Sequence, residues 1–169
     1  MGVMTDQRSV VIARWNPNSL RESTELTALL TDYHLQTEAE KGVPVTSVDA
    51  LPEKYFAEVT DPQTAFASDE VLIARHSGHA AGCLVLTTPA DRRLEIKRLW
   101  TDPKYRGRQV ATSLLEAARH HAVRTEAETI RLSVWEWRAG AIALYKKTGF
   151  IETSTWDDRD HLIGMVQAV

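Results

Sequence analysis

The spacing of hydrophobic residues along the chain separates stretches with helical periodicity from short apolar runs typical of strands. Leu26, Leu29 and Leu30 recur at the spacing of one helix face. Ser19 precedes them as a candidate N-cap, with Glu22 three residues later as in a capping box. These residues predict an amphipathic helix that begins after Ser19.

Three further helices are predicted downstream. Residues 108–124 place their apolar side chains in one stripe, with polar side chains on the other faces. A shorter pattern occupies about residues 49–59, and another spans residues 140–147. Gly149 follows the last pattern at the position where a glycine commonly ends a helix.

Short runs rich in β-branched and apolar residues, bounded by Gly, Pro, Asn and Asp, predict the strands. Residues 76–79, His-Ser-Gly-His, separate two such runs at the spacing of a tight antiparallel connection, which predicts a hairpin. Strands and helices therefore follow the order β-α-α-β-β-β-α-β-α-β-β, which indicates an α/β fold. The predicted strands occupy residues 10–14, 70–75, 80–87, 94–101, 130–137, 150–156 and 161–169.

Composition narrows the class of protein. The chain has 169 residues, 43% of them hydrophobic and 25% charged, as expected of a globular protein with a single domain over residues 1–169. A formal net charge of −3 without a Lys/Arg block argues against nucleic acid as a partner. The longest apolar stretches, such as residues 80–86, are far shorter than the roughly 20 residues that cross a membrane.

The cysteine and the paired histidines suggest little chemistry by themselves. Cys83, the only cysteine, lies in an apolar run, which favours a buried inert thiol over a nucleophile. Without a disulfide or an N-terminal signal pattern, the expected compartment is the cytoplasm. His76 and His79 have no matching set of ligands, so we expect solvated turn residues and no metal.

The most informative segment is the turn between the strand at residues 94–101 and the helix at residues 108–124. Backbone N–H groups and the positive end of the helix dipole converge there and favour an anion. Arg106 and Arg108 add positive charge to the same turn. The segment predicts a phosphate-binding loop, with two solvated loop arginines as the simpler alternative.

This segment resembles the acyl-CoA-binding motif of the GNAT superfamily of N-acyltransferases, Arg/Gln-x-x-Gly-x-Gly/Ala. Arg106 and Ala111 match its ends, whereas Gln109 stands in place of the central glycine. Residues 141–150 resemble the family's second signature, Ala-x-x-Leu-Tyr followed by Gly-Phe. Arg138 stands where the family often has asparagine, so a contact of that side chain is not transferred.

The resemblance implies a fold and a donor. The GNAT-type fold has a mixed, mostly antiparallel central sheet of six to seven strands flanked by helices. Acetyl-CoA, or another acyl-CoA, is the implied co-substrate, with no metal, and the oligomeric state stays open between a monomer and a homodimer. The residues implied to bind the donor are Leu99, Trp100, Thr101, Arg106, Gly107, Arg108, Gln109, Val110, Ala111, Thr112 and Tyr145.

The resemblance also implies direct attack of a primary amine on the thioester. Because an ammonium group is not nucleophilic, a base assists, and Glu95 stands where several family members carry a catalytic glutamate. Pairing of Glu95 with Lys97 or Arg98 is the alternative. Tyr145 would protonate or hydrogen-bond the leaving thiolate, and the Leu99 backbone N–H, at the family's strand bulge, would stabilise the oxyanion.

The acceptor is expected to be a small-molecule amine. Aromatic walls with carboxylates suit a cationic amine, and Tyr33, Glu38, Trp135 and Trp137 are the candidates. Core tryptophans and a solvated glutamate are the alternative. Two other functions stay open: transfer from an acyl group on a carrier protein, suggested by Gln109, and a noncatalytic acyl-CoA-binding module.

Overall fold

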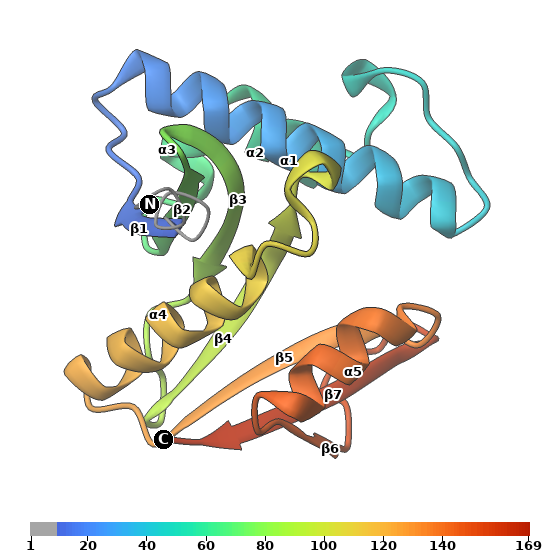
Figure 1. The fold of residues 1–169 in the computed structure, drawn as a ribbon. Helices are drawn as coiled ribbons and strands as arrows, with labels where there is room; N and C mark the ends of the chain where they lie inside the picture. Colours follow the sequence, from blue (N-terminus) through green and yellow to red (C-terminus); the bar gives the residue numbers. More distant parts are fainter. Residues whose placement is uncertain (1–9) are drawn as a thin grey trace, which may run out of the picture. The chain divides into compact units, whose positions relative to one another are not determined.

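The computed structural model describes residues 10–169, and Figure 1 follows their elements in chain order. Two short 3-10 segments, η2 and η3, span Val48–Ala50 and Pro103–Tyr105. The helices are α1 (Leu20–Glu40), α2 (Glu53–Thr60), α3 (Pro62–Ala65), α4 (Val110–Arg124) and α5 (Ala139–Lys147). The strands are β1 (Val10–Arg14), β2 (Glu70–His76), β3 (His79–Leu86), β4 (Arg93–Thr101), β5 (Thr129–Trp135), β6 (Ile151–Thr153) and β7 (Leu162–Ala168).

The strands form one hydrogen-bonded sheet in the order β1-β2-β3-β4-β5-β7-β6. The pairs β1–β2, β5–β7 and β6–β7 are antiparallel, whereas β4 and β5 are parallel. The predicted α/β class with a mixed, mostly antiparallel sheet is therefore confirmed.

Contacts divide the chain into two compact units, and β4 contributes to both. The first unit contains the residues up to Val85 and Arg98–Leu114, and the second contains Leu86–Lys97 and Leu115–Val169. The single domain expected from the chain length stays a prediction.

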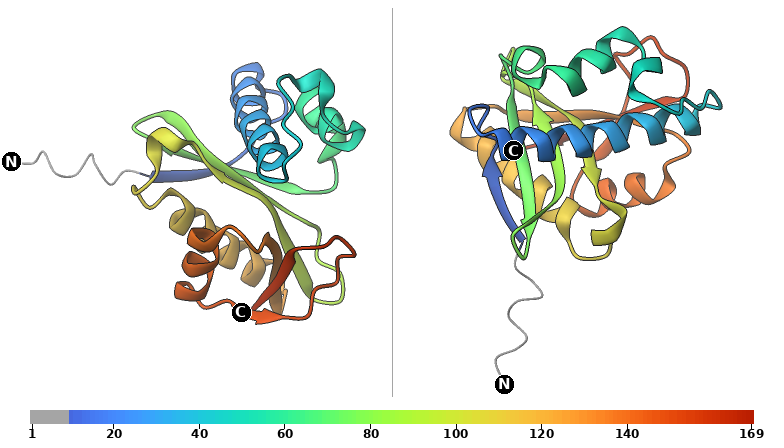
Figure 2. Two further views of the ribbon diagram at one scale, coloured as in Figure 1. Left: turned by 90° about the vertical axis from the view of Figure 1, so that its right-hand side faces the viewer. Right: turned by 90° about the horizontal axis from the view of Figure 1, so that it is seen from above.

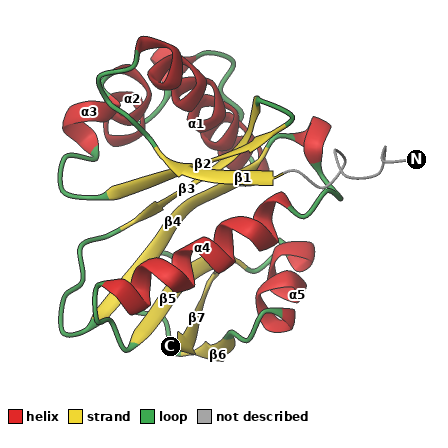
Figure 3. Cartoon of the chain, turned by 60° about the vertical axis from the view of Figure 1, so that its left-hand side comes forward, coloured by secondary structure: helices red, strands yellow, loops and turns green. Residues whose placement is uncertain are grey.

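In the first unit, helices α1, α2 and α3 cover one face of β1, β2 and β3 (Figure 3), and α1 lies beside α2 (Figure 2). The Ser19 hydroxyl accepts a hydrogen bond from the Glu22 N–H at 3.2 Å, so the predicted N-cap is confirmed. The Glu22 carboxylate caps the chain differently from a capping box, because it accepts from the Asn16 N–H at 3.0 Å. The core of this layer contains Leu26, Leu29, Leu30, Leu51, Val59, Phe66, Val71, Ile73, Cys83, Val85 and Trp100.

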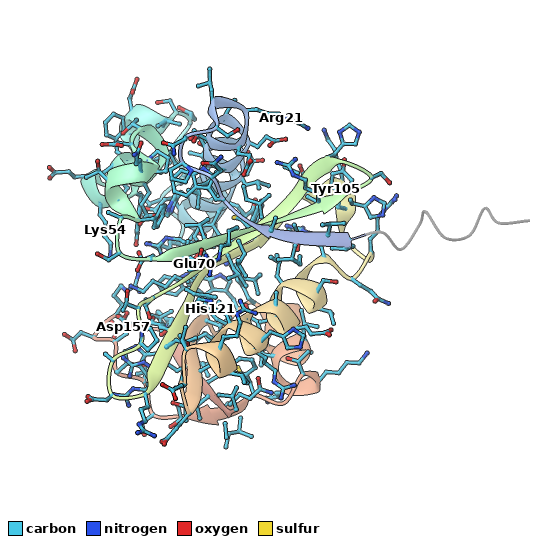
Figure 4. The ribbon with its side chains drawn as sticks, turned by 90° about the vertical axis from the view of Figure 1, so that its left-hand side faces the viewer. Arg21, Lys54, Glu70, Tyr105, His121 and Asp157 are labelled. Atoms are coloured by element: carbon cyan, nitrogen blue, oxygen red, sulfur yellow. The ribbon has the colours of Figure 1, made fainter. Side chains whose placement is uncertain are left out.

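The β2–β3 hairpin has the turn that its sequence predicts. Ser77 and Gly78 have φ angles of 51° and 82°, and a tight hairpin turn of type I′ requires positive φ at both central residues. The expectation that His76 is solvated is wrong: His76 is buried, and its ring lies 5.6 Å from that of Tyr105, labelled in Figure 4. His79 is exposed.

In the second unit, β5 pairs with β4 on one side and with β7 on the other, and α5 lies alongside β5 and β7 in Figure 1. The β4–β5 ladder runs from Arg93–Thr129 to Ile96–Leu132. The β5–β7 ladder continues beyond it and ends at Trp135–Leu162. The last residues of β5 therefore pair with β7.

Some strand boundaries differ from the predictions, and one short helix was not predicted. Helix α1 ends at Glu40, and its last residues, Glu-Ala-Glu, favour helix. Trp137 lies beyond β5, and β6 is limited to Ile151–Thr153 by its short ladder with β7. The short helix α3 was not predicted; it begins at a proline, and Asp61 caps it.

No helix among residues 10–169 combines the length and apolar character that a bilayer crossing requires. Helix α1 is 21 residues long but carries charged residues such as Arg21, Glu25 and Asp32. Over the same described range, no group of three or more His, Cys, Asp or Glu side chains is arranged to hold a metal ion.

Gly82 of β3 packs closely against the backbone of β4 and the side chains of the first turns of α4. A Cβ at this position would lie 2.6 Å from the Trp100 carbonyl oxygen and 2.8 Å from Val110 Cγ1. We expect Gly82→Ala to lower the free energy of unfolding by about 1–3 kcal/mol, because the crowded atoms must shift. Urea unfolding of Gly140→Ala provides the control, since a Cβ there meets nothing within 4 Å. Equal stability of both variants would contradict the prediction.

Candidate active site

The loop before α4 has the backbone of an anion-binding turn. Gly107 and Gln109 have φ angles of 78° and 65°, whereas Arg108 between them has negative φ. Such alternation turns successive N–H groups toward one side, and the free N–H groups of the helix start follow directly. The segment from Gly107 to Val110 can therefore present several backbone donors to one phosphate.

The loop is anchored at both ends. The Asp102 N–H donates to the Ala81 carbonyl at 2.8 Å, and the Asp102 carboxylate accepts from the Lys104 N–H at 2.9 Å. At the other end Val110 is buried. The loop between these anchors is exposed at Gly107, and Ala111 and Thr112 in the first turn of α4 are half-buried.

The two arginines of the loop differ in their surroundings. The Arg106 guanidinium lies over the ring of Trp100 at 5.2 Å, a cation–π contact that restrains it. Trp100 is buried, and both Arg106 and Arg108 are exposed. Arg106 is thus held beside the loop, and Arg108 adds an exposed charge.

Gln109 occupies a conformation that glycine adopts at little cost. A residue with a side chain pays roughly 1–2 kcal/mol for the left-handed region, and glycine loses about 0.5–1 kcal/mol in entropy on folding. We expect Gln109→Gly to raise the free energy of unfolding by about 0.5–1 kcal/mol, measured by thermal unfolding. Gln109→Ala retains the backbone cost and should show no gain. A gain of the same size in both variants would contradict this reason.

Strand β4 changes its backbone direction at Arg98. Its φ is 57°, which makes it the one left-handed residue inside a strand among residues 10–169. A left-handed residue within a strand is a feature of β-bulges. The Arg98 carbonyl accepts a hydrogen bond from the Cys83 thiol at 3.7 Å. Because a trans peptide is planar, the Leu99 N–H points away from Cys83.

The side chain of Arg98 belongs to a buried polar cluster that the sequence did not predict. Arg98 Nε and Nη2 donate to the two oxygens of Glu58 at 2.8 and 2.7 Å. His34 Nε2 lies 2.8 Å from Glu58 Oε1, so a carboxylate of α2 joins α1 to β4. His34 and Glu58 are 1% and 4% exposed. Tyr55 stacks on His34 at 4.4 Å.

The charges of this cluster stabilise one another. Burial alone would raise the pKa of Glu58, but hydrogen bonds from Arg98 and His34 lower it from 4.5 to about 2. Burial lowers the pKa of Arg98, but the hydrogen bond to Glu58 outweighs it and the pKa rises. Burial lowers the pKa of His34 despite Glu58. A carboxylate, a guanidinium and a neutral imidazole result, with the His34 proton on Nε2.

Cys83 is fully buried, as predicted for a core cysteine. Burial raises the pKa of its thiol to about 12, and the nearby charge of Arg98 opposes that shift only in part. The thiol is therefore a hydrogen-bond donor to the Arg98 carbonyl and a poor nucleophile.

Two of the predicted acceptor residues lie in the first unit. The Tyr33 ring meets the Trp100 ring edge-on at 6.0 Å. Glu38 is buried rather than solvated, and its carboxylate accepts from Lys41 Nζ at 2.8 Å. Tyr33 therefore lies beside a residue of the predicted donor site, whereas the charge of Glu38 is already paired.

Hydrogen bonds at the C-terminal end of α5 fix the backbone at Tyr145. The Phe150 N–H donates to the Tyr145 carbonyl at 2.9 Å, and the Gly149 N–H donates to that of Lys146 at 3.1 Å, which is the Schellman pattern. Gly149 has a φ of 107°, and the rings of Tyr145 and Phe150 lie edge to face at 5.9 Å. The signature residues Tyr145, Gly149 and Phe150 thus form one helix ending that fixes a buried tyrosine.

Glu95 of β4 lies in the second unit. Its carboxylate lies 4.0 Å from Arg131 Nε on the paired strand β5, and its N–H donates to the Thr87 hydroxyl. The alternative partner Arg98 bonds to Glu58 instead. Glu95 is half-buried, and its ion pair with Arg131 is long.

Trp135 and Trp137 stack at 4.9 Å with an interplanar angle of 10°. Trp135 is buried, whereas Trp137 is 39% exposed. The Arg159 guanidinium lies 5.4 Å from the Trp135 ring. Trp135 is therefore the buried member of the aromatic pair, and Trp137 is the exposed one.

The structure places the predicted residues in two groups. The first unit brings together Leu99, Trp100, Thr101, the loop from Arg106 to Gln109 and Tyr33. The second unit holds Glu95, Tyr145, Trp135 and Trp137. That both groups act on one substrate stays a prediction.

Comparison with known proteins agrees with these features. A model described as "Acetyltransferase (GNAT) family" matches residues 28–150. The chain is similar to an uncharacterized N-acetyltransferase of Mycobacterium bovis, with 36% identity over 109 residues, 61% of this chain and 64% of the relative. It is 33% identical to an IAA acetyltransferase of Azospirillum brasilense over 94 residues, 54% of this chain and 61% of the relative. The chain thus spans less than two thirds of either relative.

Solved structures share the fold at lower sequence identity. The PaiA N-acetyltransferase of Thermoplasma acidophilum, in complex with coenzyme A, has a TM-score of 0.70 and 19% identity. The match covers 95% of this chain and 99% of that protein.

Proposed function

Because the chain belongs to the GNAT family of acetyltransferases, we propose that it transfers an acetyl group from acetyl-CoA to the primary amine of a small molecule. The acyl group passes directly from donor to acceptor in a ternary complex. The roles of Leu99, Glu95 and Tyr145 in this transfer are part of the same proposal.

The observation that carries the proposal is the backbone of the loop before α4. The left-handed residues Gly107 and Gln109 turn its N–H groups toward one side at a helix start. Arg106, held over Trp100, and the exposed Arg108 supply charge for the phosphates of the donor. Thr101, Ala111 and Thr112 flank the loop and complete the donor site.

The Leu99 N–H is proposed to stabilise the oxyanion. When the amine attacks, the carbonyl oxygen of the thioester gains charge, and a fixed backbone donor lowers the energy of that intermediate. The Cys83–Arg98 hydrogen bond supports this role, because it turns the peptide so that the Leu99 N–H points away from the core thiol.

Proton transfer is assigned to Glu95 and Tyr145. Glu95 accepts a proton from the ammonium group of the acceptor, directly or through water, and the neutral amine then attacks the thioester. Tyr145 donates its proton to the departing thiolate when the intermediate collapses. The long ion pair of Glu95 and the rigid helix ending around Tyr145 support these roles.

The acceptor is proposed to be a cationic amine with a flat or apolar body. Tyr33 and Trp137 supply aromatic surface, and Trp135 backs Trp137. Because Glu38 is already paired with Lys41, it contributes less negative charge than its sequence position suggested.

Free acetyl-CoA is the proposed donor, ahead of a charged carrier protein. Gln109 was the residue that suggested a carrier protein, because it replaces the motif's glycine. Since Gln109 adopts the left-handed conformation that this glycine would provide, the backbone donors are retained. The loop can therefore bind the phosphates of free acetyl-CoA, and Gln109 gives no reason to prefer a carrier protein as the acyl donor.

The test combines binding with turnover. Calorimetry should detect CoA binding, and a panel of amines incubated with acetyl-CoA should yield thiol release and a product heavier by one acetyl group. Acetylated carrier protein serves as the comparison donor. CoA binding without transfer to any amine would indicate a binding module, and the lack of any response to CoA thioesters would overturn the proposal.

A further inference from the structure

The buried cluster of His34, Glu58 and Arg98 lies next to the peptide bond that leads into Leu99. Arg98 is the residue whose left-handed conformation creates the bend in β4. A residue with a side chain persists in this conformation only where its surroundings hold it. Arg98 is held at two points, because Glu58 binds its guanidinium and Cys83 binds its carbonyl.

The position of Glu58 suits a role in holding Arg98 rather than a reaction with substrate. Both oxygens of Glu58 bond to Arg98, and Oε1 also lies 2.8 Å from His34 Nε2. The carboxylate is 4% exposed and His34 is 1% exposed, so neither offers a free position to an acceptor. The rings of Tyr33 and Tyr55 lie 5.9 and 5.3 Å from the guanidinium and restrict it further.

A purely stabilising role explains this cluster poorly. Buried ion pairs are often replaced by apolar residues of similar volume without loss of stability. The cluster instead connects α1 and α2 to Arg98, the residue at which β4 bends. The Cα of Arg98 is two covalent bonds from the Leu99 nitrogen. The backbone conformation of Arg98 sets the direction of that N–H, because the peptide bond is planar.

We infer that Glu58 and His34 are positioning residues, which hold Arg98 in its left-handed conformation and so direct the Leu99 N–H at the thioester carbonyl. The inference rests on the proposed acetyl transfer. It assigns to helices α1 and α2 a part in the orientation of the oxyanion donor.

The test compares Glu58→Gln with Glu25→Gln in the full chain. Glu25 is a matched control, since it also binds an arginine through two hydrogen bonds, but that arginine is Arg75 of β2 rather than a residue of β4. We expect Glu58→Gln to lower kcat about tenfold, part of the effect of losing an oxyanion donor, with little change in KM for acetyl-CoA. Glu25→Gln should match the wild type. The acceptor is the best amine from the panel.

A spectroscopic measurement separates orientation from simple loss of fold. The infrared band of acetyl-CoA, isotopically labelled at its carbonyl carbon, should shift on binding to the wild type as the Leu99 N–H polarises the bond. The shift should shrink in Glu58→Gln and stay intact in Glu25→Gln. An unchanged shift and kcat in folded Glu58→Gln would overturn the inference.

The double variant Glu58→Leu/Arg98→Met guards against a variant that merely unfolds. Apolar replacement of both partners should retain the fold, as judged by circular dichroism, while kcat stays low. Recovery of wild-type kcat in this variant would overturn the inference. A wild-type protein that neither binds CoA nor transfers acetyl would refute the proposed function itself, whereas an active wild type with an equally active Glu58→Gln refutes only the positioning role.

Discussion

Replacing Tyr145 with phenylalanine is expected to lower kcat by about 100-fold, which is the lower part of the range for a general acid. We expect the lower end because a thiolate is a good leaving group and depends less on protonation than an alkoxide or an amine anion does. The thiol of an ordinary cysteine has a pKa of about 8.5. Phenylalanine retains the edge-to-face contact with Phe150 and the helix ending at Gly149. The affinity for CoA and the thermal midpoint should therefore stay close to the wild type.

Steady-state kinetics with acetyl-CoA and the best amine of the panel provide the measurement. Tyr105→Phe is the control, because this tyrosine makes its ring contact with His76 in the first unit. A Tyr145→Phe variant with wild-type kcat would show that Tyr145 only packs against its neighbours. Loss of CoA binding together with kcat would instead point to a role in donor binding.

Acidification from pH 4.5 to pH 2 is expected to remove about 3 kcal/mol of folding stability through Glu58. The pKa of Glu58 is about 2 in the folded protein, against 4.5 for the same group in an unfolded chain. Each unit of pKa difference corresponds to about 1.36 kcal/mol. Because the folded pKa is the lower one, the unfolded chain binds the proton first, and stability falls as the pH falls. His34 acts in the same direction below its ordinary pKa of 6.5, since its pKa is also lowered.

Urea unfolding at a series of pH values measures this dependence. Glu58→Gln should lose the Glu58 part of the pH dependence and should be about 3–5 kcal/mol less stable at pH 7, because Arg98 stays buried without its counter-charge. Glu25→Gln should retain that dependence, since Glu25 and Arg75 form a separate, more exposed pair. A Glu58→Gln variant with the full wild-type dependence would contradict the assignment.

Local sequence patterns determined most of the elements. The leucine stripe and Ser19 cap produce α1, and the Ser77-Gly78 turn produces the β2–β3 hairpin, because each depends on residues within a few positions. The Leu-Tyr…Gly-Phe signature likewise encodes a helix ending, whose hydrogen bonds join neighbours in the chain. Boundaries such as the end of β5 were less accurate, because the ladder with β7 decides them.

The chemistry of the loop before α4 was also visible in the sequence, but its conformation was not. Arg106, Gly107 and Arg108 indicate a phosphate site by their types and order. Gln109 adopts a left-handed conformation that is usual for glycine, and the surrounding fold keeps it there. The sequence alone showed only a departure from the motif.

The sequence by itself thus determined the order of elements, the family signatures and the candidate donor loop. Only the tertiary structure joined Glu58 to His34 and Arg98, which lie 24 and 40 positions away in the chain. No periodicity or turn preference encodes such a contact, since a buried ion pair forms only after helices and strand have packed. For the same reason, only the packed core showed that Arg98 bends β4 while Cys83 holds its carbonyl.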